Sequence, residues 1–326
     1  QVKAAKSFFD SMPFPVHVQW TNSPSVIELL KNQEKNGLEL LGTPGKGWAV
    51  WQGIGVATRK SDVVALFDAD IRTFSPLYPS RMMLPLLDES YGISYVKAFY
   101  SRLSLETNQL QGRATRLFVG PLLASLEQLV GKGPFLQYLQ SFRYPLAGEF
   151  AFTKDLAMNL RIPCDWGLEI GLLSEMQRNQ AYNRICQVDI ADTYDHKHQV
   201  LSENDTSKGL SKMSIDISKT LIRKLAAQGD TFTSNTLRTI KATYYRTALD
   251  LLEIYNNDAK INGLSLDINE EEIAIELFSN NIIIAGQEFL ENPNENPLIP
   301  NWNRVQNTMP DFKEKFIKAV TEDSKI

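Results

Sequence analysis

Short apolar segments alternate with amphipathic ones in this 326-residue chain until about Ser214. Residues 62–67 are predicted to form a strand, because the continuous apolar run from Val63 to Phe67 is typical of a strand buried on both faces of a sheet. Apolar residues at helical spacing precede this run at Val26, Leu29 and Leu30 and follow it in residues 114–130. Because strands that alternate with helices build parallel sheets, the sequence predicts an α/β fold with a mostly parallel sheet.

The same patterns predict further elements along the chain. We expect strands at residues 16–20, 38–41, 94–99 and 145–152, and helices at residues 1–11, at 165–176 and in the segment that ends at Ala57. After about Ser214 the apolar spacing is helical only, at residues 215–227, 236–255, 270–278 and 312–320. The sequence therefore predicts a helical C-terminal region.

Charge and hydropathy exclude two kinds of partner. The chain has 34 Lys and Arg against 38 Asp and Glu, a net charge of −4, and no basic patch of a size that would bind a phosphate backbone. Its longest apolar runs are far shorter than the roughly 20 residues of a membrane span. We therefore expect no nucleic acid partner and no membrane-spanning segment.

Cysteine usage indicates the compartment. Cys164 and Cys186 are too few for a disulfide framework, and their spacing is not that of a metal site. This is typical of a reducing environment, so we expect a cytoplasmic protein. The chain opens at Gln1 within a helical pattern, and we expect a further segment upstream of it.

Asp68 directly follows the strand predicted at residues 62–67, and Asp70 lies two residues further on. In open α/β sheets, ligands bind at the carboxyl ends of the strands, and residues two apart in extended backbone point the same way. Two converging carboxylates repel each other unless a cation lies between them, and oxygen ligands suit Mg²⁺ or Mn²⁺. The alternative interpretation is a solvated turn in which an aspartate caps the next helix.

Two other segments carry groups that could bind phosphate or metal. Lys46 lies between Gly45 and Gly47 before a helix, where glycine permits close approach of a phosphate to the backbone and lysine supplies a cation. An ordinary turn is the alternative. His196 and His198 flank Lys197, so one imidazole could join the two aspartates on a metal, or the segment is a solvated loop.

A third segment and two isolated carboxylates complete the candidates. Gly112, Arg113 and Thr115 stand at a helix start, where backbone amides, a guanidinium and a hydroxyl could hold an anion or could simply cap the helix. Glu149 and Glu169 lie among apolar and glycine residues, so each needs a hydrogen-bonding partner from the protein or from a ligand such as a sugar.

The order of these segments resembles that of the retaining glucosyl-3-phosphoglycerate synthases, which are GT-A-fold glycosyltransferases related to mannosylglycerate-type synthases. The resemblance covers roughly residues 38–200 and rests on the combination of several short segments. The segments are Pro44-Gly45-Lys46-Gly47, Asp68-Ala69-Asp70, Lys97-Ala98-Phe99-Tyr100, Gly112-Arg113-Ala114-Thr115, Pro121-Leu122-Leu123, Gly148-Glu149, residues 167–173 and His196. The family's opening strand has no counterpart here, and we expect it upstream of Gln1.

The resemblance implies a divalent metal, Mg²⁺ or Mn²⁺, held by Asp68, Asp70 and His196 on the diphosphate of a sugar nucleotide. It implies that Lys46 contacts that diphosphate and that Glu169 lies near the donor sugar, so that Asp68, Lys46 and Glu169 bind the donor. Asp70 and Glu169 are the catalytic residues that it implies.

For the acceptor, the resemblance implies Gly112, Arg113 and Thr115, with His198 nearby. The implied reaction transfers a hexose, for which the resemblance favours glucose, from a UDP- or GDP-sugar to 3-phosphoglycerate, glycerate or a similar three-carbon acid. The anomeric configuration of the sugar is retained. Mannosyl transfer, a sugar-phosphate nucleotidyltransferase and a non-catalytic scaffold are the alternatives.

The resemblance also implies a division of the chain by role. A Rossmann-like part that binds the nucleotide sugar spans residues 1–110, and a part that carries the acceptor segment and the metal histidine spans 111–210. The helical C-terminal region spans 211–326, where it could form a homodimer interface or cover the active site.

Overall fold

The computed structural model describes residues 2–13, 16–32, 40, 45–104, 107–195, 201–202, 205–294 and 298–324. These residues form two compact units. Unit 1 comprises residues 1–64, 154–165 and 296–326, and unit 2 comprises residues 65–153 and 166–295. This grouping reflects contacts within the chain, whereas the predicted division at residues 110 and 210 is by role and stays a prediction.

Unit 1 is built from helices that come from both ends of the chain and from one segment in its middle. They are α1 (Val2–Phe9), α2 (Pro24–Lys31), α3 (Lys46–Ala57), α7 (Lys154–Asn159), α12 (Trp302–Thr308) and α13 (Phe312–Asp323). Their core is aromatic, with the rings of Trp51 and Trp302 stacked at 4.4 Å and Phe316 against both. Each indole donates a hydrogen bond to a backbone carbonyl, so neither polar N–H is left unsatisfied by its burial.

Unit 2 contains the sheet, apart from Val63 and Val64 at the start of β1, which belong to unit 1. The strand order is β1 (Val63–Leu66), β4 (Phe150–Thr153), β2 (Tyr95–Ser104), β3 (Gln109–Leu110), and β5 (Ile185–Tyr194) also pairs with β2. Strand β2 is antiparallel to β4 and β3 and parallel to β5. The α/β expectation is confirmed, but a mostly parallel sheet is not, because the sheet is mixed.

The strand β1 differs from its predicted environment. Only Val64 is buried, and Val63, Ala65 and Leu66 keep intermediate exposure. The continuous apolar run predicted burial on both faces, but a strand of four residues at the end of the strand order is covered less completely than a central one.

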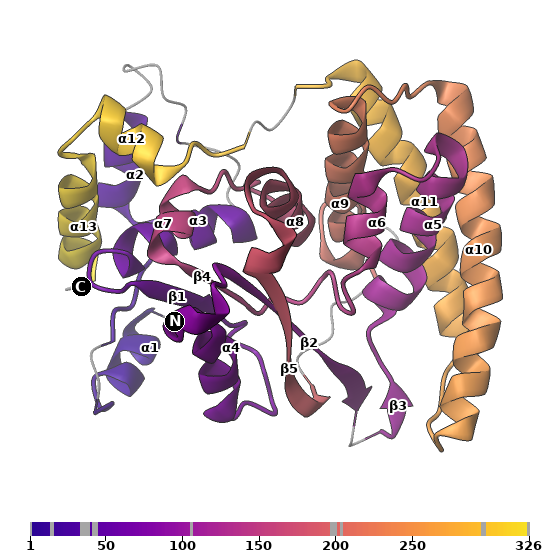
Figure 1. Ribbon diagram of the computed structural model, residues 1–326, viewed down its shortest axis with the longest axis horizontal. Coiled ribbons are helices and arrows are strands. Elements are labelled where there is room, and N and C mark those ends of the chain that lie inside the picture. The colour runs from indigo at the N-terminus through magenta and orange to yellow at the C-terminus, as the bar shows by residue number, and fades with distance from the viewer. Residues whose placement is uncertain are drawn as a thin grey trace. The chain divides into compact units, whose positions relative to one another are not determined.

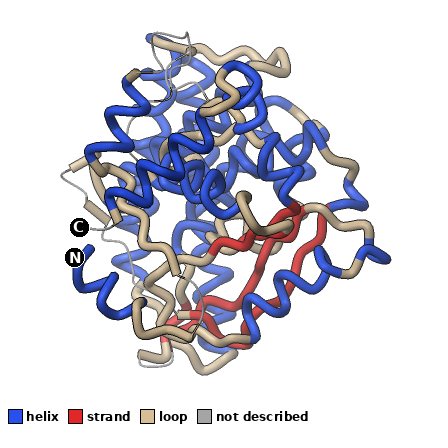
Figure 2. The backbone as a smooth tube through the Cα atoms, turned by 90° about the vertical axis from the view of Figure 1, so that its left-hand side faces the viewer, coloured by secondary structure: helices blue, strands red, loops and turns tan. Residues whose placement is uncertain are grey.

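Helices pack on the sheet and on one another in unit 2. Helix α4 (Leu77–Leu87) contacts β2, β4 and β5, and α8 (Leu168–Asn179) contacts α6 (Pro134–Gln140) and α9 (Gly209–Ala226). Helices α5 (Gly120–Val130), α9, α10 (Ser234–Ile261) and α11 (Ile268–Glu291) run side by side as a bundle (Figure 1). Helix dominates the backbone and the strands form one group (Figure 2). The prediction of a helical C-terminal region is confirmed.

The bundle helices begin at residues whose side chains cap them. Thr233 and Thr236 form a reciprocal capping box at the start of α10, and Asp267 accepts a hydrogen bond from the Glu270 amide at the start of α11. A buried contact ties the bundle to the segment that precedes α5, since the Tyr244 hydroxyl donates to the Leu117 carbonyl at 2.6 Å. The caps explain why these two helices begin two residues before the ranges predicted from apolar spacing alone.

Two predicted strands have different outcomes. Residues 16–20 are irregular rather than a strand, so that prediction is wrong. The strand predicted at residues 38–41 falls outside the described residues except for Leu40. Among the helices that the structure describes, none has the length and apolar character needed to cross a membrane.

Two glycines of α3 should respond in opposite ways to alanine. A Cβ on Gly55 would overlap the indole of Trp302, whereas a Cβ on Gly53 would meet nothing within 4 Å. We expect Gly55→Ala to destabilise the protein by about 1–3 kcal/mol through overpacking. Gly53→Ala should stabilise it by about 0.5–1 kcal/mol through helix propensity. Denaturant unfolding followed by tryptophan fluorescence measures both, and equal effects would contradict this packing.

Candidate functional site

Asp68 and Asp70 lie at the carboxyl end of β1, as predicted. Asp68 is partly exposed and Asp70 is exposed, in a turn that begins two residues after the strand. Both carboxylates therefore belong to a surface that a ligand can reach. Asp68 interacts with other groups of the protein, and its amide lies 3.5 Å from Oε1 of Glu149.

Glu149 is fully buried beside Asp68. Its carboxylate accepts a hydrogen bond from the Tyr100 hydroxyl at 2.6 Å and another from the Tyr194 hydroxyl at 2.5 Å. The two phenol rings stack on each other with centroids 3.7 Å apart. The sequence predicted a hydrogen-bonding partner for this glutamate, and the partners are two protein hydroxyls.

The elements around Glu149 converge there for a structural reason. Glu149 directly precedes β4, Tyr100 lies within β2, and Tyr194 is the last residue of β5. The register between β2 and β5 shifts on both sides of Tyr100, an irregularity of the kind that re-aims side chains next to functional sites. Burial, with the charge of Glu149 as the next cause, raises the pKa of both tyrosines well above the usual range.

The end of β5 is also tied to the segment that carries the two aspartates. The Arg72 amide donates to the Asp195 carbonyl at 2.9 Å, and the Asp195 amide donates to the Thr73 hydroxyl at 3.1 Å. The Arg72 guanidinium lies 3.7 Å from the Asp195 carboxylate. These bonds hold Asp195 next to Arg72 and Thr73. His196 and His198 follow Asp195 directly but fall outside the described residues.

The metal site stays a prediction. Over the described residues, no three Asp, Glu, His or Cys side chains are grouped in a way that would hold a metal ion. Asp68 and Asp70 would supply two oxygen ligands, and the predicted third ligand, His196, is not described.

Lys46 is the first residue of α3 in unit 1. Gly45, which precedes the helix, and Gly47 both approach the backbone of residues 163–165, where a Cβ on either would come too close to a carbonyl oxygen. The Trp48 amide donates to the Cys164 carbonyl at 3.2 Å. The glycines are therefore needed for chain packing within unit 1, and a phosphate contact at Lys46 stays a prediction.

Glu169 lies in the first turn of α8 and is buried. The field of the helix N-terminus favours its negative charge there. Burial of Tyr95 raises the pKa of that phenol well above its usual range, and the charge of Glu169 adds to the effect. Glu169 has contacts within the protein, so a donor-sugar contact stays a prediction.

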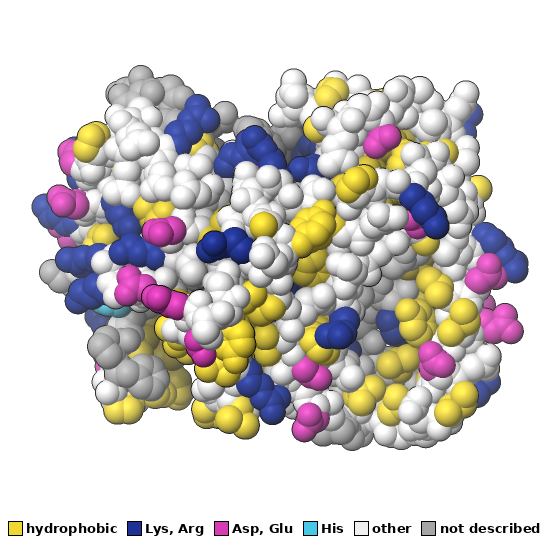
Figure 3. Space-filling model, viewed as in Figure 1, with side chains coloured by type: hydrophobic (Ala, Val, Ile, Leu, Met, Phe, Trp, Pro, Cys, Tyr) yellow, Lys and Arg dark blue, Asp and Glu magenta, His cyan; other side chains and the backbone are white. Residues whose placement is uncertain are grey.

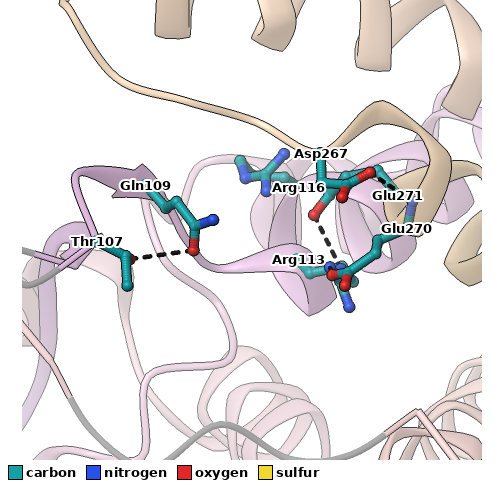
Figure 4. A network of polar contacts seen from close by, with 7 residues as sticks. All are labelled: Thr107, Gln109, Arg113, Arg116, Asp267, Glu270 and Glu271. Atoms are coloured by element: carbon teal, nitrogen blue, oxygen red, sulfur yellow. Dashed lines mark hydrogen bonds and ion pairs between the residues drawn. The ribbon is translucent and has the colours of Figure 1, made fainter.

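The acceptor segment predicted at residues 112–115 meets the start of α11 (Figure 4). Arg113 Nε donates to Glu271 Oε1 at 2.9 Å, and Arg113 Nη2 lies 3.3 Å from Glu270 Oε2. Arg116 Nη2 donates to the other Glu271 oxygen at 3.1 Å, so one carboxylate joins both arginines. Sequence reasoning missed these glutamates because more than 150 residues separate them from Arg113.

The local backbone of that segment is unusual. Gly112 has φ of +82°, and a Cβ there would lie 3.3 Å from Arg102 Cβ and from the Tyr144 hydroxyl oxygen. A π-helical turn, Ala114–Val119, follows, and such turns occur often at functional sites. The buried Thr115 Oγ1 and Arg116 Nη1 have no hydrogen-bond partner among the described residues. Most buried polar groups in proteins are hydrogen-bonded, so these two atoms are exceptions.

A separate cavity of about 350 Å³ lies in unit 2 at the opposite end of β5. Tyr138, Tyr182, Ile185 and Gln187 are among its lining residues. Ile185 is the first residue of the strand and Tyr194 is the last, which separates them by roughly 30 Å of strand. Of the predicted site residues that the structure describes, none lines this cavity.

Two curated relatives resemble the chain over nearly its whole length. The glucosyl-3-phosphoglycerate synthase of Persephonella marina is 40% identical over 326 residues, which are 99% of this chain and 80% of the relative. The enzyme of that name from Methanococcoides burtonii is 40% identical over 319 residues, which are 98% of this chain and 78% of the relative. A scan of protein-family models finds no match.

A solved structure is also similar. It is the glucosyl-3-phosphoglycerate synthase of Mycobacterium tuberculosis in complex with Mn²⁺, uridine diphosphate and glucosyl-3-phosphoglycerate. It is 31% identical, and the alignment covers 56% of this chain and 55% of that chain with a TM-score of 0.44.

A double-mutant cycle tests the tyrosine contacts of Glu149. Glu149→Gln replaces one acceptor oxygen by a donor and should destabilise the protein by about 1–3 kcal/mol. Tyr100→Phe should lower the free energy of unfolding less in the Glu149→Gln protein than in the wild type, because the hydrogen bond between the two residues is already weakened there. The difference between the two losses, the coupling energy, should be about 0.5–3 kcal/mol. Urea unfolding measures all four proteins, and strictly additive costs would show that the contact contributes nothing.

Tyr194 should make stability depend on alkaline pH. Its folded pKa is raised, so above the unfolded value of about 10 only the unfolded chain releases the phenol proton. The contribution of Tyr194 to the free energy of unfolding is therefore complete below pH 10, and it falls by about 1.4 kcal/mol per pH unit above pH 10. The stability of Tyr194→Phe should decline correspondingly less steeply than that of the wild type between pH 10 and 11, and parallel curves from urea unfolding would refute this.

Proposed function

The chain belongs to the glucosyl-3-phosphoglycerate synthase family, and we propose that it transfers glucose from UDP-glucose to the hydroxyl of 3-phosphoglycerate with retention of configuration. Identity of 40% over 99% of the chain carries this proposal. Membership makes the chain a glycosyltransferase, and we infer the GT-A arrangement from it. A cytoplasmic location and a homodimer remain expectations.

The end of β1 fits a divalent cation of the Mg²⁺ or Mn²⁺ type. Asp68 and Asp70 present carboxylate oxygens, the ligands these ions prefer, and both side chains reach the surface. Asp195, which precedes His196 in the sequence, is hydrogen-bonded to Arg72 and Thr73 just beyond the two aspartates. We propose Asp68, Asp70 and His196 as the ligands. The ion would stabilise the negative charge that develops on the departing diphosphate.

The residues of the chain provide the remaining functions. The Lys46 ammonium, at the N-terminus of α3, binds the diphosphate of the donor, and the Glu169 carboxylate binds hydroxyl groups of the donor sugar. Glu149 holds Tyr100 and Tyr194 in place and lies against the Asp68 backbone, so it fixes the position from which Asp68 acts. Such fixed positions lower the barrier because the groups need little rearrangement during reaction.

The acceptor binds at residues 112–115 in this proposal. Gly112 lets the backbone turn, and Arg113 and Thr115 offer donors to the phosphate or carboxylate of 3-phosphoglycerate. The unpartnered Thr115 hydroxyl and Arg116 Nη1 support an anion at this segment. Orientation of the attacking hydroxyl toward the anomeric carbon is the contribution of this segment to the rate. His198 is proposed beside it.

Asp68→Asn tests the metal role. It removes one anionic ligand while keeping the side-chain shape, and we expect glucose transfer and Mn²⁺ affinity to fall by at least about tenfold to a hundredfold. Asp62→Asn, an equal change of charge at an exposed position before β1, is the control and should leave both unchanged.

The assay uses UDP-glucose with 3-phosphoglycerate and Mn²⁺, with product identification by mass spectrometry and metal binding by calorimetry. GDP-mannose in a parallel reaction tests mannosyl transfer, and hexose phosphate with a nucleoside triphosphate tests nucleotidyl transfer. Full activity of Asp68→Asn would eliminate the proposed metal role, and absence of transfer by the wild type would eliminate the proposed reaction.

A further inference from the structure

The guanidinium of Arg113 is engaged on one edge by two carboxylates from α11 (Figure 4). Glu271 binds Nε and Glu270 lies against Nη2. These two nitrogens form the edge that binds a phosphate or carboxylate side-on with two parallel hydrogen bonds. An anionic acceptor that uses Arg113 therefore competes with a carboxylate of the protein.

The two glutamates differ in how firmly they are held. The Glu271 side chain is 5% exposed and bridges Arg113 and Arg116, so its removal would leave a buried guanidinium uncompensated. The Glu270 side chain is 65% exposed and forms an ion pair with Arg113 at 3.3 Å. Exposed pairs of this kind are weak. Glu270 can therefore be displaced, whereas Glu271 holds the segment in place.

The start of α11 keeps Glu270 near Arg113. Asp267 caps the helix by accepting the Glu270 amide at 3.1 Å. Glu270 then lies in the first turn, where the helix dipole favours a negative charge. Both basic and acidic side chains lie on the face drawn in Figure 3. The local contacts of each arginine determine its availability to an anion.

We propose that Glu270 is an internal competitor of the acceptor. Its carboxylate occupies Nη2 of Arg113 until the phosphate or carboxylate of the acceptor displaces it, so Glu270 sets the acceptor KM. This inference rests on the proposed function, because it takes Arg113 as the acceptor-binding residue. Glu270 itself touches neither substrate nor the reacting atoms.

Glu270→Gln tests the inference, because it removes the charge and keeps the length of the side chain. We expect the KM for 3-phosphoglycerate to fall about twofold to fivefold, the range that corresponds to an exposed ion pair. The KM for UDP-glucose and kcat should stay at wild-type values. Calorimetric titration of 3-phosphoglycerate without donor should show the same gain in affinity.

Glu276→Gln is the matched control. It makes the same change of charge at another exposed position of α11, six residues and about 9 Å further along the helix, where screening weakens its effect on Arg113. Its acceptor KM should equal that of the wild type. Thermal unfolding of both variants checks that the fold is retained.

The two assays separate the inference from the proposed function. An acceptor affinity that is unchanged or weaker in Glu270→Gln, or an equal gain in Glu276→Gln, overturns the inference even if transfer proceeds. If the wild type binds 3-phosphoglycerate but transfers no glucose, the proposed function fails, and the titration still decides the role of Glu270. If neither protein binds 3-phosphoglycerate, the inference fails as well.

Discussion

The buried carboxylate of Glu149 is the contact on which the arrangement of the site depends. Burial of a charged group is unfavourable unless hydrogen bonds replace water, and two tyrosine hydroxyls do so here. Because those tyrosines belong to β2 and to the end of β5, satisfying one carboxylate fixes both strands against the start of β4. The Asp68 amide approaches the same carboxylate, so the backbone of this surface aspartate is held in place by a buried residue.

A second buried carboxylate has a comparable role at the acceptor segment. Glu271 joins Arg113 and Arg116 and thereby fastens a π-helical turn to the start of α11. In both places a buried glutamate joins two side chains that come from other elements. Glu270, exposed and weakly paired, differs from them in being replaceable by a ligand.

Local patterns predicted the features that depend on local sequence. The strand before Asp68, the amphipathic α3 and the helices α8 and α10 all follow from spacing and turn residues within a few positions. The segment at residues 16–20 has a strand pattern but is irregular, because a strand also needs a pairing partner. Helix α11 runs past the predicted residue 278 because its apolar residues 282–285, which break simple amphipathic spacing, lie within a bundle that covers several sides of it.

By itself, the sequence determined the chemical groups of the candidate site and their order along the chain, which was enough to indicate the family. It also determined that Glu149 needed a partner, since an ionisable group among apolar neighbours is rarely left alone. Only the tertiary structure decided which partners met: two tyrosines at Glu149, and two glutamates more than 150 residues away at Arg113. Only the tertiary structure also decided which strands pair parallel and which antiparallel. Pairing joins residues that are distant in sequence, and local periodicity carries no information about the direction of the partner strand.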